Sequence, residues 1–257
     1  MTAFRTAQPL AWTFHRGTAC QRFDNPQVVQ PPPEPGREDP SAPWIRLPPS
    51  LRVAAPLTDL VRGRVSCRVF RDEPIGFAEL ATLLRAGYGA TDDGTLLDRA
   101  VPSAGGLYPL EVSLLVRSVD DLSAGIYHYV PRADGLEKVR GKAVPAPLIR
   151  YLFLGQPWAA EAAVVLVFSA VCRRSLGKYG DRGYRYLLLE AGHAGQNVVL
   201  TATGLGLGSI NLGGFLDDEL SGLLRVDLES EIVLYATAVG HPAPGNRTAR
   251  RGLDRLL

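Results

Sequence analysis

The chain has 257 residues, of which 46% are hydrophobic and 21% charged, a composition typical of a globular protein with one large domain or two small ones. Its net charge of +2 and the lack of a basic stripe argue against a nucleic-acid-binding protein. It has no signal-peptide pattern, no apolar run of membrane-spanning length and no Cys/His ligand spacing, so we expect a cytoplasmic protein with no disulfide framework and no metal site.

The first 56 residues differ from the rest of the chain and are predicted to form an extended arm. Prolines cluster at positions 31–35 and 48–49, and proline interrupts both helices and central strands. The large apolar residues Trp12, Phe14 and Trp44 favour an arm that wraps around a neighbour over one that stays mobile. We therefore divide the chain into a Pro-rich arm over residues 1–56 and a folded domain over residues 57–257.

In the folded domain, residues 64–70 alternate between polar and apolar side chains. In an extended segment Arg64, Ser66 and Arg68 would point the same way. Two guanidinium groups that flank a hydroxyl suit a phosphate, because each can donate charge-assisted hydrogen bonds to its oxygens. A solvated edge strand has the same spacing, so both interpretations stay open at this point.

Helices and strands then follow in a mixed α+β order. The helix over 74–88 has apolar residues at helical spacing, and strands are predicted over 111–116 and 125–130. Residues 101–112, which lead into the first of these strands, contain two prolines, two glycines and a serine. Such small residues let backbone N–H groups approach a flat cofactor, although a tight turn explains them equally well.

The second half of the domain begins with residues 162–170, an almost unbroken apolar run that suits a central strand covered on both faces. After it, Lys178 and Tyr179 lie between glycines in a predicted loop at the entrance of a helix, with Asp181 as its N-cap. An amine and a phenol side by side can offer one pocket a general base. An ordinary loop with solvent-facing charges is the alternative.

The helix over 181–203 is apolar on most sides and is therefore predicted to be buried. Glu190, His193 and Asn197 fall on one stripe of it, which forms either a hydrogen-bonded core row or a face toward a cofactor or a second subunit. A loop over 208–215, with paired glycines that can lie against a planar ring, a helix from about 217 and a strand over 231–239 complete the domain.

These segments, in this order and spacing, resemble the nitroreductase-like flavoproteins and, more narrowly, the SagB-type azoline dehydrogenases. The resemblance covers residues 57–242 and is carried by RxSxRxF, VPSAGGLYPLEV, GIYHYVP, KYGDRGYRYLLLEAGHAGQN, GLGLGSINLGGF and LYATAVGHP. It implies a nitroreductase-like α+β fold, with a central, mainly antiparallel sheet flanked by helices. It also implies a homodimer that holds each FMN between two subunits.

The resemblance also implies the roles of individual residues. It places Arg64, Ser66 and Arg68 at the phosphate and ribityl side of FMN, with Arg250 and Arg251 reaching the phosphate from the tail. The implied ring contacts are Pro102, Ser103, Ala104 and Gly105 from the partner subunit, Glu190, and the backbone of Leu212, Gly213 and Gly214. Lys178 and Tyr179 match the Lys-Tyr pair of azoline dehydrogenases, and Asn211 stands where many relatives have proline.

The implied function is the FMN-dependent oxidation of thiazoline or oxazoline rings to thiazole or oxazole in a ribosomally synthesised peptide. Lys178 or Tyr179 would remove a proton, hydride would pass to the flavin, and dioxygen would reoxidise it. The expected partners are the peptide and a separate cyclodehydratase that makes the azoline. The alternatives are an NAD(P)H-dependent nitro or quinone reductase, which needs no such base, and a non-catalytic flavin-binding scaffold of a peptide-modifying complex.

Overall fold

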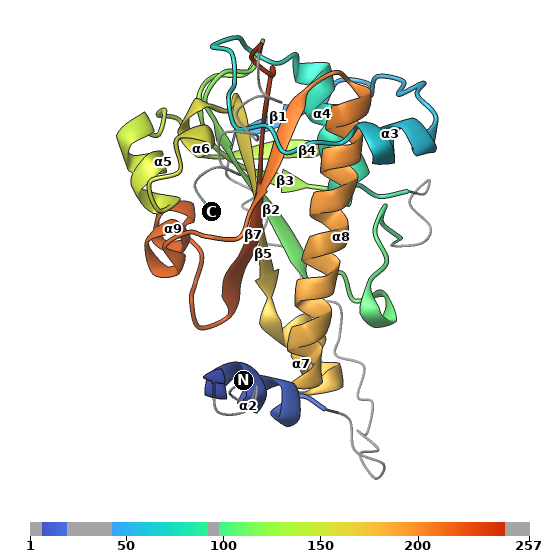
Figure 1. The fold of residues 1–257 in the computed structure, drawn as a ribbon, viewed down its shortest axis with the longest axis vertical. Coiled ribbons are helices and arrows are strands. Elements are labelled where there is room, and N and C mark those ends of the chain that lie inside the picture. The colour runs from blue at the N-terminus through green and yellow to red at the C-terminus, as the bar shows by residue number, and fades with distance from the viewer. Residues whose placement is uncertain (1–6, 20–42, 92–97, 245–257) are drawn as a thin grey trace.

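The computed structural model describes residues 7–19, 43–91 and 98–244, with one sheet at its centre (Figure 1). The sheet has seven strands in the order β1-β4-β3-β2-β5-β7-β6, and each neighbouring pair is antiparallel. The strands are β1 (Trp44–Arg46), β2 (Leu110–Val116), β3 (Gly125–Val130), β4 (Gly135–Arg140), β5 (Val164–Val171), β6 (Gly208–Leu212) and β7 (Glu231–Gly240). This confirms the predicted α+β fold with a mainly antiparallel sheet.

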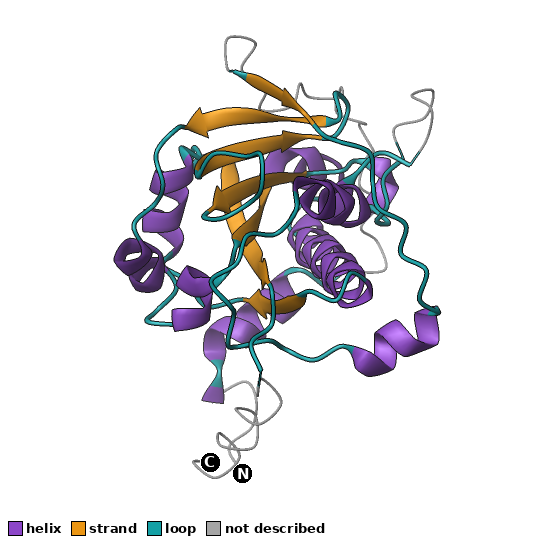
Figure 2. Ribbon diagram, turned by 90° about the horizontal axis from the view of Figure 1, so that it is seen from above, coloured by secondary structure: helices purple, strands orange, loops and turns teal. Residues whose placement is uncertain are grey.

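Helices cover both faces of the sheet (Figure 2). The helices are α2 (Pro9–Gly17), α3 (Leu57–Gly63), α4 (Phe77–Tyr88), α5 (Ala146–Leu152), α6 (Pro157–Glu161), α7 (Cys172–Tyr179), α8 (Arg182–Gly204) and α9 (Asp217–Leu224). One apolar core joins α4 and α8 to the sheet, and a second core on the opposite face includes α5, α6 and α9.

The central strand β5 was correctly predicted from its apolar run. The run is apolar at nearly every position because β5 contributes side chains to both cores. Leu166 and Phe168 belong to the core under α4 and α8, whereas Val165 and Val167 belong to the opposite core. Successive side chains of a strand point to opposite faces, so a strand between two helical layers needs apolar residues at every position.

Helix α8 is buried on one side only, contrary to the expectation from its composition. Leu188 and Leu189 are 42% and 59% exposed. The predicted polar stripe also divides, since Glu190 is buried and His193 is exposed. Asn197 donates hydrogen bonds to the carbonyls of Ala86 and Ala100 at 3.1 and 3.0 Å, which places it in the structural layer against α4.

The N-terminal arm is not extended throughout, so the prediction is wrong for α2. Pro9 occupies the start of this helix, where its missing N–H leaves no bond unmade. Arg185 of α8 donates hydrogen bonds to the hydroxyl of Thr18 and the carbonyl of His15, and Phe14 packs edge-on against Tyr184 with ring centroids 5.6 Å apart. Residues 44–46 of the arm form β1 and pair with β4, while the prolines at 31–35 lie outside the described residues.

The predicted loop over 208–215 is also partly wrong, because its first five residues form β6, which pairs with β7. Asn211 therefore lies in a strand, where its side-chain oxygen accepts a hydrogen bond from Thr237 at 2.6 Å. Within the described parts of the chain, no helix combines the length and the apolar character that crossing a bilayer requires.

Candidate active site

Lys178 and Tyr179 occupy the last turn of α7, a helix that the sequence analysis did not predict. The loop predicted around Lys178 and Tyr179 is therefore reduced to the two residues between α7 and α8. Gly180 has a φ of +53°, which turns the chain so that α8 can begin two residues later. Asp181 does precede α8, as predicted for an N-cap, but its side chain makes no capping hydrogen bond. The ring of Tyr179 packs edge-on against Tyr186 with centroids 5.0 Å apart.

The pair lies directly over Gly105, in the loop that the sequence predicts as a flavin contact. A Cβ atom built on Gly105 would lie 2.5 Å from Tyr179 Oη and 2.8 Å from Lys178 Nζ. The amine and the phenol therefore converge on one glycine, and that glycine and Pro102 in the same loop are exposed. Two segments that are distant in sequence thus form a single site.

Gly105 and Gly106 offer a matched pair of substitutions. Their φ angles are +66° and +65°, so an alanine at either position carries the same backbone strain of about 1–2 kcal/mol. Only at Gly105 does the new methyl group displace Lys178 and Tyr179, since nothing lies within 4 Å of a Cβ at Gly106. We expect Gly105→Ala to lower turnover up to ~10²-fold more than Gly106→Ala, because a misplacement of about 1 Å has that effect. Steady-state kinetics and melting curves of both variants check this, and equal turnover would contradict the placement.

Glu190 of α8 is hydrogen-bonded to the same loop. Its carboxylate accepts hydrogen bonds from Tyr88 Oη at 2.7 Å and from Ser103 Oγ at 2.6 Å. Each hydroxyl in turn accepts a backbone N–H, from Leu110 at 3.0 Å and from Tyr108 at 2.9 Å. Both hydroxyls are therefore oriented as donors to the carboxylate, and the loop is tied to α8 and α4.

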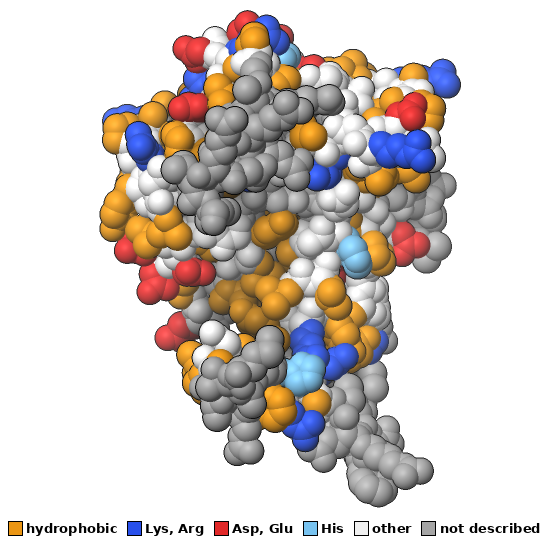
Figure 3. All heavy atoms as spheres, viewed as in Figure 1, with side chains coloured by type: hydrophobic (Ala, Val, Ile, Leu, Met, Phe, Trp, Pro, Cys, Tyr) orange, Lys and Arg blue, Asp and Glu red, His pale blue; other side chains and the backbone are white. Residues whose placement is uncertain are grey.

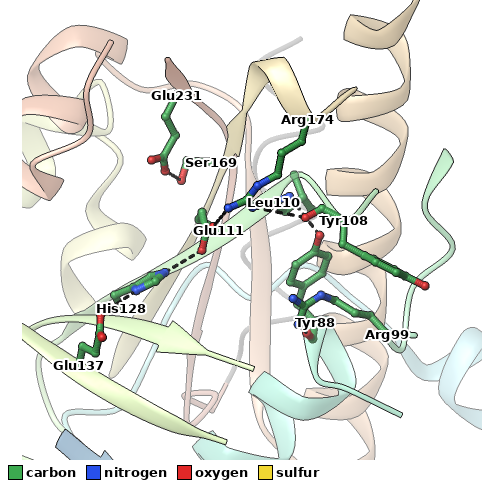
Figure 4. A network of polar contacts seen from close by, with 10 residues as sticks. All are labelled: Tyr88, Arg99, Tyr108, Leu110, Glu111, His128, Glu137, Ser169, Arg174 and Glu231. Carbon is green, nitrogen blue, oxygen red and sulfur yellow. Dashed lines mark hydrogen bonds and ion pairs between the residues drawn. The ribbon is translucent and has the colours of Figure 1, made fainter. Parts of the chain in front are cut away.

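Burial raises the pKa of Glu190 to about 7, although the hydrogen bonds from Ser103 and Tyr88 and the charge of Arg99 act in the opposite direction. Glu190 is only 2% exposed. The guanidinium of Arg99 lies over the rings of Tyr88 and Tyr108, at 4.8 and 5.5 Å from their centroids, and Figure 4 shows these residues around the start of β2. Glu190 is thus poised to change its charge near neutral pH.

These contacts bear on the predicted ring contacts. The Ser103 hydroxyl is engaged by Glu190 and by the Tyr108 N–H, so its hydrogen points into the protein. Both oxygens of Glu190 are likewise engaged. Ser103 and Glu190 therefore help to fix the shape of the loop. A flavin contact by Pro102, Ser103, Ala104, Gly105 and Glu190 stays a prediction.

The segment with Arg64, Ser66 and Arg68 lies beside β6. Ser66 forms an isolated parallel bridge with Ser209, and the N–H of Cys67 donates to the Ser209 carbonyl at 2.9 Å. Arg64, Ser66 and Arg68 are half-buried, whereas Cys67 between Ser66 and Arg68 is fully buried. The guanidinium of Arg68 lies 5.8 Å from the ring centroid of Trp158.

The segment with Leu212, Gly213 and Gly214 continues from β6. Leu212 is buried, so its contribution to a ligand is restricted to backbone, while Gly213 is exposed. Gln156 Nε2 donates to the Gly214 carbonyl at 3.0 Å, and Gln156 Oε1 accepts from Trp158 Nε1 at 3.1 Å. Because Trp158 also contacts Arg68, the two predicted cofactor segments share a support.

Within one chain, α8 separates the loop around Gly105 from the segment that follows β6. Glu190 contacts Ser103, whereas a Cβ at Gly195 would lie against Tyr235 and Asn211. Five residues turn a helix by about 500°, so these two faces of α8 are roughly 140° apart. In Figure 1, the green segment that includes residues 101–108 and the strands β6 and β7 accordingly lie on opposite sides of α8.

Other contributors were missed by the sequence analysis. They are Tyr88, Arg99, Gln156, Trp158 and Arg174. Only Arg174 carried a usable signal, because it precedes Lys178 by four residues and would share its face on a helix. Arg250 and Arg251, predicted at the phosphate, lie outside the described residues.

Comparison with known proteins finds one matching family and several related chains. The pattern of the family described as "Nitroreductase family" matches residues 61–241. A Methanocaldococcus jannaschii protein named as a nitroreductase is 38% identical over 170 residues, which cover 66% of this chain and 84% of that protein. The microcin B17-processing protein McbC of Escherichia coli is 34% identical over 155 residues, or 56% of this chain and 54% of McbC, so the match spans about half of McbC.

Solved structures give the same result. A chain from Anabaena variabilis, described as a nitroreductase, superposes with a TM-score of 0.70 at 32% identity over 79% of this chain and 42% of that chain. A chain of the Escherichia coli microcin synthetase McbBCD complex, solved with truncated pro-MccB17 bound, superposes with a TM-score of 0.61 at 27% identity, over 77% of this chain and 78% of that chain.

Proposed function

This chain belongs to the nitroreductase family, and from that premise we propose that it is an FMN-dependent azoline dehydrogenase. It would oxidise thiazoline or oxazoline rings to thiazole or oxazole in a ribosomally synthesised peptide. The observation that carries the proposal is the convergence of Lys178 Nζ and Tyr179 Oη on Gly105, in the loop predicted to contact the flavin ring. Reduction of a nitro group or a quinone needs no substrate base, whereas aromatisation of an azoline requires that a ring proton be removed.

The residues of the chain fit FMN in their chemistry. Arg64 and Arg68 offer two half-buried guanidinium groups beside the Ser66 hydroxyl, which suit a phosphate. Gly213 and Gly214 offer exposed and half-exposed backbone beside a strand, which suits the edge of a planar ring. Figure 3 shows hydrophobic side chains gathered between α9 and α8 on this face, as an aromatic cofactor requires.

In the proposed reaction the chain supplies position and a base. Lys178 or Tyr179 takes the proton from one carbon of the azoline ring, while the loop around Gly105 holds the flavin ring in place. When bound, FMN would supply a two-electron acceptor for the hydride from the neighbouring carbon, with dioxygen as the final oxidant. The substrate thereby loses two hydrogens and becomes aromatic.

A homodimer is part of the proposal. The two predicted groups of ring contacts lie on different sides of α8, so one flavin can touch both if the second group comes from another copy. The exposed Leu188 and Leu189 on α8 supply apolar area for such an interface. The division into an arm over residues 1–56 and an FMN-binding domain over 57–257 is retained as a proposal.

The relatives favour two functions to different degrees. The similarity to McbC, and to a chain of a complex solved with a peptide bound, supports a peptide substrate and a cyclodehydratase partner. The Methanocaldococcus jannaschii relative, named as a nitroreductase, supports the alternative of an NAD(P)H-dependent reductase of nitro compounds or quinones. The two functions share one fold and differ in what reduces the flavin.

One experiment separates them. The purified protein is expected to be yellow, to release a chromophore with the mass of FMN and to elute as a dimer. Mixed anaerobically, a peptide that contains an azoline should bleach the flavin and lose two hydrogens, whereas NADPH should not. Bleaching by NADPH alone would favour the reductase. A colourless monomer would refute both, and activity only with an added cyclodehydratase would favour a scaffold.

A further inference from the structure

A row of buried ionisable side chains crosses the sheet and ends on α7, the helix of the Lys-Tyr pair (Figure 4). His128 of β3 lies between two carboxylates, with Nδ1 3.2 Å from Glu137 of β4 and Nε2 2.8 Å from Glu111 of β2. The other oxygen of Glu111 lies 2.8 Å from Arg174 Nη2. The side chains of Glu111 and Arg174 are only 6% and 11% exposed.

Glu111 is held as an anion by its two neighbours. Burial alone would raise its pKa, but the hydrogen bonds and charges of His128 and Arg174 outweigh burial, so the pKa of Glu111 lies below its ordinary value. A buried ion pair with good geometry and further hydrogen bonds is costly to break from one side, because the remaining charge loses its partner. The ion pair between Arg174 and Glu111 is therefore a strong tether between α7 and β2.

The tether connects three parts of the site. Arg174 belongs to α7 and lies four residues, about one helical turn, before Lys178. Its Nη2 binds Glu111 on β2, and its Nη1 makes a longer contact of 3.5 Å with the carbonyl of Tyr108. Tyr108 ends the loop that contains Gly105, so one guanidinium touches both the sheet and the loop.

Helix α7 depends on such contacts for its orientation. It has eight residues, including Gly177, and isolated helices shorter than about 12–15 residues are marginal in water. Ser175 Oγ donates to the Gly183 carbonyl at 3.3 Å, which joins α7 to α8 but not to the loop around Gly105. The N-cap Val171 donates to the Pro109 carbonyl at 2.9 Å, which fixes the start of α7, and the Arg174 side chain adds a connection to the loop within the helix itself.

We infer that Arg174 is a positioning residue, which holds the Lys178–Tyr179 pair over Gly105 by tying α7 to Glu111 and to the Tyr108 carbonyl. The inference rests on the proposed function of that pair. Arg174 touches neither substrate nor cofactor and acts through α7. His128 supports the same arrangement from the far side of Glu111.

The test compares Arg174→Gln with Arg132→Gln, a control that removes an exposed arginine from the turn between β3 and β4. The first measurement is hydrogen–deuterium exchange of the α7 amides, which needs no substrate. We expect exchange about ten- to a hundredfold faster in R174Q than in R132Q, as the loss of a charged hydrogen bond predicts. If R174Q does not fold, R174K, which keeps the charge but loses the planar fork, must also exchange faster than R132Q.

The second measurement is azoline oxidation. R174Q should lower kcat at least tenfold with KM and flavin content unchanged, and should have no further effect in the double background Lys178→Ala/Tyr179→Phe, because Arg174 acts only through that pair. Wild-type levels of exchange and turnover in R174Q, or a full additional loss on top of the double substitution, would overturn the inference. A wild-type protein that oxidises no azoline would instead refute the proposed function, and the exchange experiment would still decide the role of Arg174.

Discussion

Replacing Lys178 by Ala, or Tyr179 by Phe, is expected to lower azoline turnover by ~10²–10⁴-fold while the protein keeps its flavin. The size follows from general-base catalysis, since the amine and the phenol are the side-chain groups nearest to a Cβ built on Gly105. Neither change opens a large cavity, because both side chains end at an exposed loop. Single-turnover flavin reduction by an azoline peptide gives the rate directly, and the absorption spectrum gives the flavin content.

Matched controls exist for both substitutions. Lys142 is an exposed lysine outside the helices and strands, and Tyr151 of α5 is 58% exposed. Lys142→Ala and Tyr151→Phe should leave the rate unchanged. If both site variants keep full azoline oxidation, the pair has no catalytic role and the proposed function loses its carrying observation.

Glu190 is expected to make the stability of the protein fall as the pH rises from about 5 to 7.5. Its pKa of about 7 in the folded protein lies above the ordinary value of 4.5, so the folded state holds this proton more tightly than the unfolded state. The contribution is complete below pH 4.5 and is lost as the pH rises through 7. Its full size is about 3 kcal/mol, of which roughly 2 kcal/mol falls between pH 5 and pH 7.5.

Urea unfolding of the wild type and of Glu190→Gln, at fixed protein concentration, measures this. The free energy of unfolding of the wild type minus that of Glu190→Gln should fall by about 2 kcal/mol from pH 5 to pH 7.5, since glutamine cannot titrate. Glu219→Gln, which changes an exposed residue of α9, serves as control and should show no such trend. A constant difference for Glu190→Gln would mean that burial does not hold its proton near neutral pH.

The local pattern predicted most of the fold. Residues 125–130 were predicted as a strand and form β3 over the same residues, and the apolar run at 162–170 became the central strand β5. Both follow from side-chain periodicity, which acts over a few residues. The errors arose where a local signal was overridden or misread. The glycines and serine at 208–214 indicated a loop, yet pairing with β7 stabilises β6 there, and Pro9 began a helix where proline suggested an extended arm.

The candidate site was predicted in composition but not in arrangement. The residue types and their order pointed to Lys178, Tyr179 and the loop around Gly105, because flavin and base chemistry need small residues and ionisable groups at defined places. Spacing along the chain carried no information on the side-chain direction of Ser103, which depends on its hydrogen bond to Glu190. Nor did it reveal Arg174, whose partner Glu111 lies on another element.

The amino-acid pattern by itself therefore determined most of the elements, the mixture of helices and strands and the set of reactive side chains, since periodicity and residue type are read from residues close in sequence. The packing of α7 and α8 against the sheet decided which of those side chains meet. The convergence of Lys178 and Tyr179 on Gly105, the burial of Glu190 and the tether through Arg174 all join distant segments. Such contacts are set by how two apolar cores and a buried ion pair pack together, which no short stretch of sequence encodes.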